Sequence, residues 1–571
     1  MKVVSTLFFF ATFLLGLYSL NQDSIHEAQP AMFLPADTLV YLEQKNGVES
    51  FARFQNSRLG RILSSIDFPT VLFEAEVQSG DIELVKKVLD VSARVRDDDL
   101  FQAILGKRLT LALIGRRDWS PNSTNIANYL KSHLLLISRP GIKPENFDRL
   151  VSKYVDDKKI SLVPYGRYTI KRIPITTDET VATTYVNGLI LASLEERVLR
   201  ESLDLYDKKQ GTLKTNPSFI NITREMEGAG QFFYCSVKAL QEVAETLIET
   251  VTNPTELLAL HEISLLKGVN RFSYGGTRQK KILKNRFIIG LQPEAMGKRI
   301  REMVATSPSI NDSLPYAARD VLLYYWSNSL ELQPLWEMYK ERAGEQSDEV
   351  LSLQHNISGL FGYEVNELID MIGSDIGVMV RENEEELFVP IPDLALFVKL
   401  DDTEKGSDAL QKAVKHLDIK LKKGRYKNIE YFSWGLDPKE SLQPVYTIHR
   451  KYLIFANTLN MLKTIIDTPL NNTRLIGTKG FRELDPGFQT LNNSVCYVDQ
   501  ARLLRRLQEM VGWVGTMLAI QDQKAAEKSK ILIDNLIDPL FWGLSMYEKS
   551  AIRTYVRDER IYIESQTKLS N

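Results

Sequence analysis

The sequence contains few of the residues that build metal centres and disulfide scaffolds. It has two cysteines and six histidines among 571 residues. No two histidines lie three or four positions apart, no Cys-x-x-Cys pair occurs, and His261-Glu262 is not followed by the second histidine of a zinc-protease motif. A phosphate-binding glycine loop is also absent, since Gly477-Thr-Lys-Gly480 lacks the P-loop spacing. We therefore predict no metal-ligating and no cofactor-binding residues.

Signatures of nucleophilic catalysis are missing as well. There is no Gly-x-Ser-x-Gly elbow, because Gly543-Leu-Ser545 is not completed by a second glycine. Cys235 and Cys496 each follow apolar residues in a strand-like run, where a free cysteine behaves as a small hydrophobic residue. The sequence thus predicts no catalytic residue. Whether the two cysteines form a disulfide is left open, since their separation in space is not set by spacing.

The charge balance excludes a broad class of partners. The 71 basic and 73 acidic residues give a formal net charge of −2, so we predict no nucleic-acid partner.

The N-terminus carries the pattern of an export signal. Residues 3–20 are uncharged and mostly apolar, Lys2 precedes them, and Asp23 is the first charge after them. This order places the N-terminus inside and the rest of the chain outside the cytoplasm. We predict a signal peptide or signal-anchor helix at 1–20 and a linker at 21–31. The cleaved form would be periplasmic or secreted, and the retained form would be a single-pass inner-membrane protein whose partner is the membrane.

Two segments about 260 residues apart resemble one another. Residues 187–199 align with 451–463, and on the same alignment Cys235 matches Cys496. Such a long period indicates a duplicated domain. We predict repeat 1 at 32–293, an inter-repeat linker at 294–313 and repeat 2 at 314–571.

Hydrophobic periodicity predicts the α+β class, with a mainly antiparallel sheet packed with helices in each repeat. In the first repeat the expected strands are 38–43, 108–116, 132–138, 167–175, 180–193 and 231–237, with a closing hairpin at 268–292. The expected helical segments are 48–105 with a break near Pro69, 143–155, 194–206, 217–227 and a pair over 238–266. In the second repeat an amphipathic helix is expected from Leu503 to Leu518.

Several segments resemble an uncharacterised bacterial exported family, domain of unknown function 3352. They are Leu34–Tyr41, Ile372–Asp375, Leu453–Ala456, Phe481 and Cys496–Asp499. The resemblance implies a cell-envelope location and no known activity, and it supplies no site residues.

Three functional hypotheses follow. The first is a non-enzymatic, exported or membrane-tethered binding or scaffolding module with an envelope protein partner. The second is a carrier or sensor of an apolar ligand held between sheet and helices. The third is a hydrolase with a dispersed site, for which one repeat should keep a polar cluster that the other lacks.

Overall fold

The computed structural model describes residues 29–96, 98–115, 125–176, 179–383, 391–435, 443–521 and 523–570. The chain divides into two compact units. Unit 1 comprises Met1–Ala295 with Glu559–Ile561, and unit 2 comprises Met296–Asp558 with Tyr562–Asn571. The expected segment 1–20 and most of the linker 21–31 lie outside the described residues. Within the described part of the chain, no helix has the length and apolar character required to cross a membrane.

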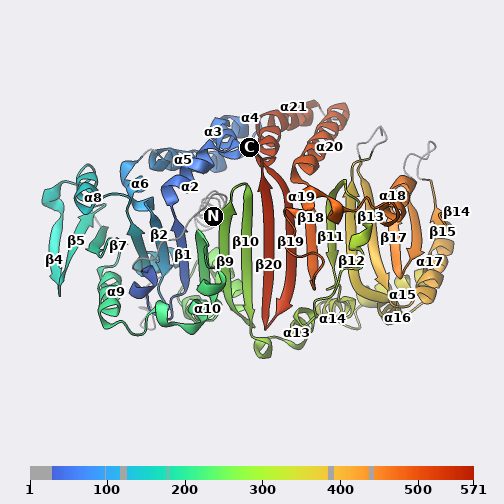
Figure 1. The fold of residues 1–571 in the computed structure, drawn as a ribbon, viewed down its shortest axis with the longest axis horizontal. Coiled ribbons are helices and arrows are strands. Elements are labelled where there is room, and N and C mark those ends of the chain that lie inside the picture. Colours follow the sequence, from blue (N-terminus) through green and yellow to red (C-terminus); the bar gives the residue numbers. More distant parts are fainter. Residues whose placement is uncertain are drawn as a thin grey trace. The chain divides into compact units, whose positions relative to one another are not determined.

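Unit 1 contains an antiparallel sheet (Figure 1). Its described strands lie in the order β10, β9, β8, β1, β2, β3, β7, β6, β5, β4. They are β1 (Val40–Lys45), β2 (Arg108–Leu113), β3 (Leu134–Arg139), β4 (Ser161–Tyr165), β5 (Tyr168–Pro174), β6 (Thr180–Val186), β7 (Leu189–Ser193), β8 (Gln231–Ser236), β9 (Val269–Gln279) and β10 (Ile282–Leu291).

Helices of unit 1 connect these strands. The α-helices are α2 (Gly47–Asn56), α3 (Arg58–Ser65), α4 (Phe68–Glu74), α5 (Ser79–Arg96), α6 (Asp99–Leu105), α7 (Ile126–His133), α8 (Pro144–Val151), α9 (Glu196–Lys208), α10 (Pro217–Glu225), α11 (Val237–Ile248) and α12 (Pro254–Ser264). Short 3-10 turns are η1 (Pro30–Phe33), η2 (Asp157–Lys159), η3 (Leu213–Thr215) and η4 (Pro293–Ala295).

Unit 2 contains a second antiparallel sheet. Its described strands lie in the order β20, β19, β18, β11, β12, β13, β17, β16, β15, β14, which is the order of unit 1 with each number raised by ten. They are β11 (Val321–Ser327), β12 (Ile372–Arg381), β13 (Asp393–Leu400), β14 (Lys422–Tyr426), β15 (Ile429–Ser433), β16 (Val445–His449), β17 (Tyr452–Ala456), β18 (Ser494–Val498), β19 (Tyr547–Arg557) and β20 (Arg560–Leu569).

The helices of unit 2 occupy corresponding connections. The α-helices are α13 (Lys298–Val304), α14 (Leu332–Ala343), α15 (Asp348–Phe361), α16 (Val365–Met371), α17 (Thr403–His416), α18 (Leu459–Leu470), α19 (Lys479–Arg482), α20 (Gln500–Gln521), α21 (Gln523–Leu532) and α22 (Asp538–Leu544). The 3-10 turns are η5 (Leu314–Tyr316) and η6 (Leu475–Gly477), and η7 (Ile533–Ile537) is a π-helical turn just before Pro539.

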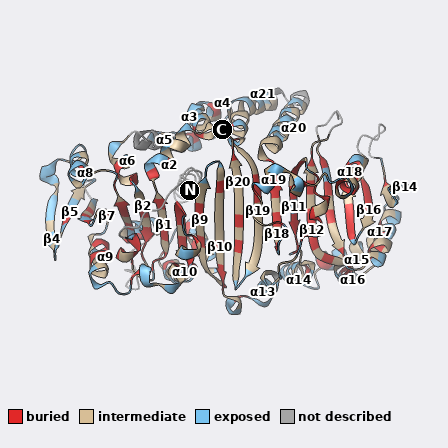
Figure 2. Ribbon diagram, in the orientation of Figure 1, coloured by how far each residue is buried: buried red, intermediate tan, exposed pale blue. Residues whose placement is uncertain are grey.

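Alternation along the strands places one face of each sheet in the core. Along β12 the buried residues are every second one: Gly373, Asp375, Gly377, Met379 and Arg381. Figure 2 shows the same banding on other central strands, while the outer faces of helices are exposed. A period of two is what a sheet covered on one side requires.

The last strand in each order is protected against further pairing. β4 contains Pro164, which has no N–H to donate, and β14 carries Lys422, Lys423 and Arg425. Proline and exposed basic side chains are devices that keep edge strands from joining other chains.

The predicted α+β class with antiparallel sheets is confirmed. The expected strand 180–193 is two strands, β6 and β7, joined at Asn187-Gly188, where both residues have positive φ as a type I′ turn requires. β4 was not predicted. The helical segment expected over 48–105, with a break near Pro69, is five shorter helices, and residues 294–313 contain helix α13 rather than linker alone.

The strand registers correct the sequence alignment by one to two residues. The turn Asn187-Gly188 corresponds to Arg450-Lys451, a spacing of 263, whereas the alignment of 187 with 451 uses 264. On β8, Tyr234 pairs with Tyr41, and on β18, Tyr497 pairs with Tyr324, again 263 apart. The expectation that Cys235 and Cys496 are equivalent is therefore wrong, because one follows this tyrosine and the other precedes it.

Candidate functional site

Unit 1 contains a cleft of about 850 Å³ between one face of its sheet and helix α10. The floor comes from β1, β2 and β8, and the loop 226–229 that follows α10 closes one side. Residues that line the cleft include Ala31, Tyr41, Glu43, Lys45, Arg108, Lys214, Phe219, Thr223, Arg224, Met226, Glu227, Ala229 and Phe232. The volume is within the range of pockets that hold small organic molecules.

The polar floor is a consequence of strand periodicity. Tyr41, Glu43 and Lys45 are alternate residues of β1, so their side chains share one face of the sheet. On the neighbouring strands, Arg108 of β2 pairs with Lys45 and Phe232 of β8 pairs with Glu43, so these side chains join the same face.

Helix α10 is set over this floor by its first residues. The Asn216 side chain accepts hydrogen bonds from the N–H groups of Ser218 and Phe219, and Pro217 is the first helical residue. Asn216 also donates to the carbonyl of Ala36, which fixes the start of the helix to the chain just before β1. An Asn-Pro pair is a strong helix-start signal.

Glu43 is the centre of the cluster. Its Oε2 accepts a 2.5 Å hydrogen bond from the Tyr41 hydroxyl. Its Oε1 lies 4.0 Å from Nζ of Lys45 and 3.9 Å from Nε of Arg108. The side chains of Lys45, Arg108 and Glu43 are 19%, 13% and 12% exposed, so the charges are largely removed from bulk water.

The two cations differ in how well they are satisfied. Lys45 donates a 2.9 Å hydrogen bond from Nζ to the carbonyl of Ala229. For Arg108, the 3.9 Å approach to Glu43 is the one ion pair with a described residue, and it is too long for a hydrogen bond. A guanidinium has five donors, so Arg108 can still donate to a ligand.

Burial shifts the ionisation of two floor residues. It raises the pKa of Tyr41 well above its usual value, and the neighbouring Glu43 carboxylate adds to this rise. Burial also lowers the pKa of Lys45 below 10.5; the Glu43 carboxylate opposes this, and the Arg108 charge adds to it. Tyr41 therefore stays neutral near pH 7.

The lining of the cleft is more positive than the chain as a whole. Four cationic side chains (Lys45, Arg108, Lys214 and Arg224) face two anionic ones (Glu43 and Glu227), a net charge of +2. The whole chain has a formal net charge of −2. The cleft is thus a local positive site in a slightly negative protein.

Unit 2 fills the corresponding place. Tyr41 of β1 and Tyr324 of β11 have matching positions, because each pairs with a tyrosine of the neighbouring strand. Two residues further along, Glu43 of β1 therefore corresponds to Trp326 of β11. Trp326 is fully buried, and so are Phe481 of α19 and Phe488 of the loop that follows α19. Phe481 and Phe488 pack edge to face with ring centroids 5.1 Å apart. Unit 2 therefore has an aromatic core where unit 1 has a charged cleft.

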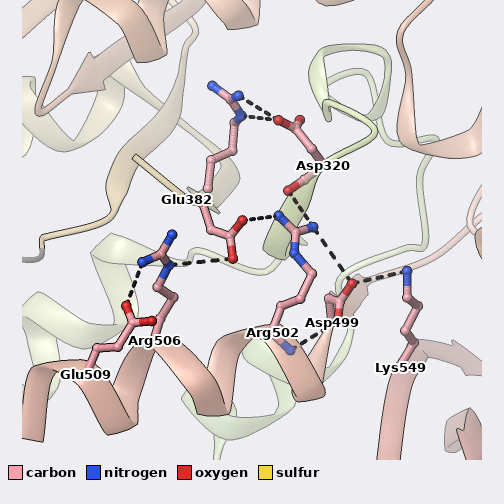
Figure 3. Close-up of polar contacts among 8 residues, drawn as sticks. Asp320, Glu382, Asp499, Arg502, Arg506, Glu509 and Lys549 are labelled. Atoms are coloured by element: carbon pink, nitrogen blue, oxygen red, sulfur yellow. Dashed lines mark hydrogen bonds and ion pairs between the residues drawn. The ribbon is translucent and has the colours of Figure 1, made fainter. Parts of the chain in front are cut away.

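Unit 2 has its own charge cluster, at the start of α20 (Figure 3). Arg502 donates to Glu382 at 2.7 Å and to the carbonyl of Asp320 at 3.2 Å. The Arg502 hydrogen bond lowers the pKa of Glu382. Lys549 lies 3.1 Å from Asp499. Every charge drawn has an opposite partner, so this cluster fixes α20 to the sheet and leaves no unmatched charge for a ligand.

The residues singled out from the sequence lie elsewhere. Cys235 and Cys496 are both free, and burial raises the pKa of their thiols to about 12 and about 11, which disfavours the reactive thiolate. The Leu503–Leu518 stripe lies on α20, which packs on β19 and α22. Among the described residues, no three histidine, cysteine or carboxylate side chains gather in a metal-binding arrangement.

Sequence reasoning missed the cleft residues. A partial signal was present, because a strand period of two places Glu43 and Lys45 on the same face as Tyr41, which is buried. A charge in the buried phase of a strand is unusual and marks a position worth attention. Arg108 is 63 positions away from Lys45, and pairing the two requires the strand register.

Known proteins show only weak similarity to this chain. No protein-family model matches the sequence, and no curated protein is significantly similar to it. Crystal form IV of TP0453 is similar at 10% identity and a TM-score of 0.24, covering 46% of this chain and 81% of that one. Crystal form I is similar at 9% identity and a TM-score of 0.24, covering 50% and 89%. TM-scores this low carry no argument about fold or function.

Proposed function

We propose that the protein is a non-enzymatic binding protein of the cell envelope in which unit 1 carries the ligand site and unit 2 is structural. The observation that carries the proposal is the contrast at one sheet position. Unit 1 places Glu43 there, over an 850 Å³ cleft, whereas unit 2 places the fully buried Trp326 there. The envelope location rests on the export-like N-terminus and on the resemblance to domain of unknown function 3352.

The comparison of the units assumes that they are copies of one domain, and side-chain contacts support this. In each unit a tyrosine at the end of the last strand in the order donates a 2.9 Å hydrogen bond to an aspartate, and a cation lies over its ring. The members are Tyr165, Asp204 and Arg200 in unit 1 and Tyr426, Asp467 and Lys463 in unit 2. The spacing is 263 for the aspartates and the cations, which matches the registers.

Binding fits the cleft better than catalysis does. A hydrolase needs an activated nucleophile, or a base positioned to activate one. The Tyr41 hydroxyl stays neutral, and Glu43 accepts its hydrogen bond beside two cations. The cleft lining contains no cysteine or histidine. The polar asymmetry expected of an enzyme is present, and its geometry favours holding a molecule in place.

The test is to purify the full-length protein under mild conditions and identify bound small molecules by mass spectrometry. Thr223 of α10 lines the cleft, so Thr223→Trp should fill it and remove the bound molecule. Thr246→Trp is the matched control. Thr246 is an exposed helical threonine whose hydroxyl, like that of Thr223, bonds to the backbone of its own helix.

Three results would contradict the proposal. The first is a wild-type protein without a bound molecule, and the second is a bound molecule kept by Thr223→Trp. The third, a stoichiometric protein partner held equally by all variants, would favour the scaffolding hypothesis. Circular dichroism on each variant establishes that it is folded.

A further inference from the structure

We infer that the unit 1 cleft binds an amphiphilic monoanion, with a carboxylate or phosphodiester head at Arg108 and Lys45 and an apolar body against the aromatic wall. This inference rests on the proposed function and names the class of ligand.

The charges on the floor indicate that the head group of the ligand is an anion. Lys45 and Arg108 face the single carboxylate of Glu43, so the inner cluster has a net charge of +1. One added negative charge balances it. The planar guanidinium of Arg108 has no hydrogen bond to a described residue, and a carboxylate or phosphate can accept two parallel hydrogen bonds from it. A neutral ligand would leave that cation uncompensated.

The apolar body follows from the remaining walls. Phe219, Phe232 and Met226 line the cleft and are 5%, 7% and 6% exposed. Phe219 and Phe232 pack edge to face at 5.8 Å, and Tyr41 lies 5.2 Å from Phe219. A small oxyanion would contact only the floor, whereas an apolar tail would also contact these walls.

The same arrangement sets a pH dependence. Binding needs the protonated Lys45, whose pKa is lowered below 10.5 by burial, so affinity should fall as the pH rises toward 10.5. Tyr41 remains neutral over this range because its pKa is raised. The other charged groups on the lining are Glu43, Arg108, Lys214, Arg224 and Glu227. Lys45→Arg should remove this fall in affinity at alkaline pH, as measured by calorimetric titration at several pH values. An unchanged fall in affinity in this variant would contradict a role for Lys45.

The test uses three probes on the full-length protein: octanoate, octan-1-ol and inorganic phosphate, each titrated by calorimetry. Octanoate should bind about tenfold or more tighter than either of the others. Arg108→Met should weaken the binding of octanoate by about tenfold or more and leave the binding of octan-1-ol unchanged. Arg108→Lys should weaken octanoate binding less, because lysine keeps the positive charge and loses only the two parallel hydrogen bonds of the guanidinium. Arg197→Met, on the exposed face of α9, is the control and should bind like the wild type.

The outcomes separate the two levels of the argument. If octan-1-ol binds as tightly as octanoate and Thr223→Trp abolishes both, the cleft binds a ligand but the anionic head is wrong. If phosphate equals octanoate, the site takes free oxyanions and the apolar body is wrong. If no probe binds in a way that Thr223→Trp removes, the amphiphilic monoanion is overturned, and the co-purification experiment decides the proposed function separately.

Discussion

Replacing Trp326 with alanine should lower the free energy of unfolding of unit 2 by about 3–5 kcal/mol. Trp326 is fully buried on β11 and is the largest fully buried side chain among the described residues. Truncation to alanine removes the whole indole and leaves a cavity in the core of unit 2. The measurement is urea unfolding of the full-length protein, followed by circular dichroism and by the fluorescence of the remaining tryptophans of unit 2.

Trp326→Phe is the matched control. The indole Nε1 of Trp326 has no hydrogen-bond acceptor among the described residues. Phenylalanine keeps an aromatic ring and removes this buried donor, so part of the lost packing is offset. We expect a cost well below that of Trp326→Ala. Equal costs for the two variants would contradict the view that ring packing at this position holds unit 2 together.

Replacing Arg381 with methionine should also lower the free energy of unfolding by about 3–5 kcal/mol. The Arg381 side chain is 6% exposed. It donates to Asp320 at 2.6 Å and to Thr464 at 2.9 Å, and it lies 3.7 Å from Asp393, which is 1% exposed. Methionine has a similar length, so the main change is that a buried carboxylate loses its cation. Urea unfolding monitored by tryptophan fluorescence reports this loss, since Trp326, Trp336, Trp434, Trp513 and Trp542 all lie in unit 2.

Arg506→Met separates charge burial from charge pairing. Arg506 bonds Glu509 and lies 3.5 Å from Glu382, as Figure 3 shows, but its side chain is 34% exposed. Water screens such a pair, and its removal should cost no more than about 1 kcal/mol. If Arg381→Met costs as little as Arg506→Met, the buried pair does not stabilise unit 2 as argued.

Much of the sheet could be predicted because its strands carry their own pattern. β2 and β8 are apolar runs flanked by polar residues, and their positions were predicted within three residues. β4 was missed because Ser161–Tyr165 contains Pro164 and has no buried residue, so it shows neither alternation nor a hydrophobic run. Inside residues 48–105 the break near Pro69, where Asp67 caps α4, was expected, whereas the boundaries capped by Ser57 and Asp98 were missed because local capping divides one helical pattern.

The cleft could not be predicted, for a different reason. Glu43 and Lys45 are two positions apart, and a strand period places them together, but Arg108 and Phe232 reach them through pairing between distant strands. A shift of one residue in either register would turn those side chains to the opposite face. The equivalence of Glu43 and Trp326 follows from the strand registers, which pair Tyr41 with Tyr234 and Tyr324 with Tyr497.

The contrast between Glu43 and Trp326 also bears on how this chain can evolve. Polar groups and an open volume at a sheet surface reduce folding stability, which limits how freely such a site can change. Unit 2 has the same strand order and an aromatic core, so its sequence is constrained by packing. On the proposed function, the floor residues of unit 1 are therefore the positions where we expect substitutions when the ligand changes.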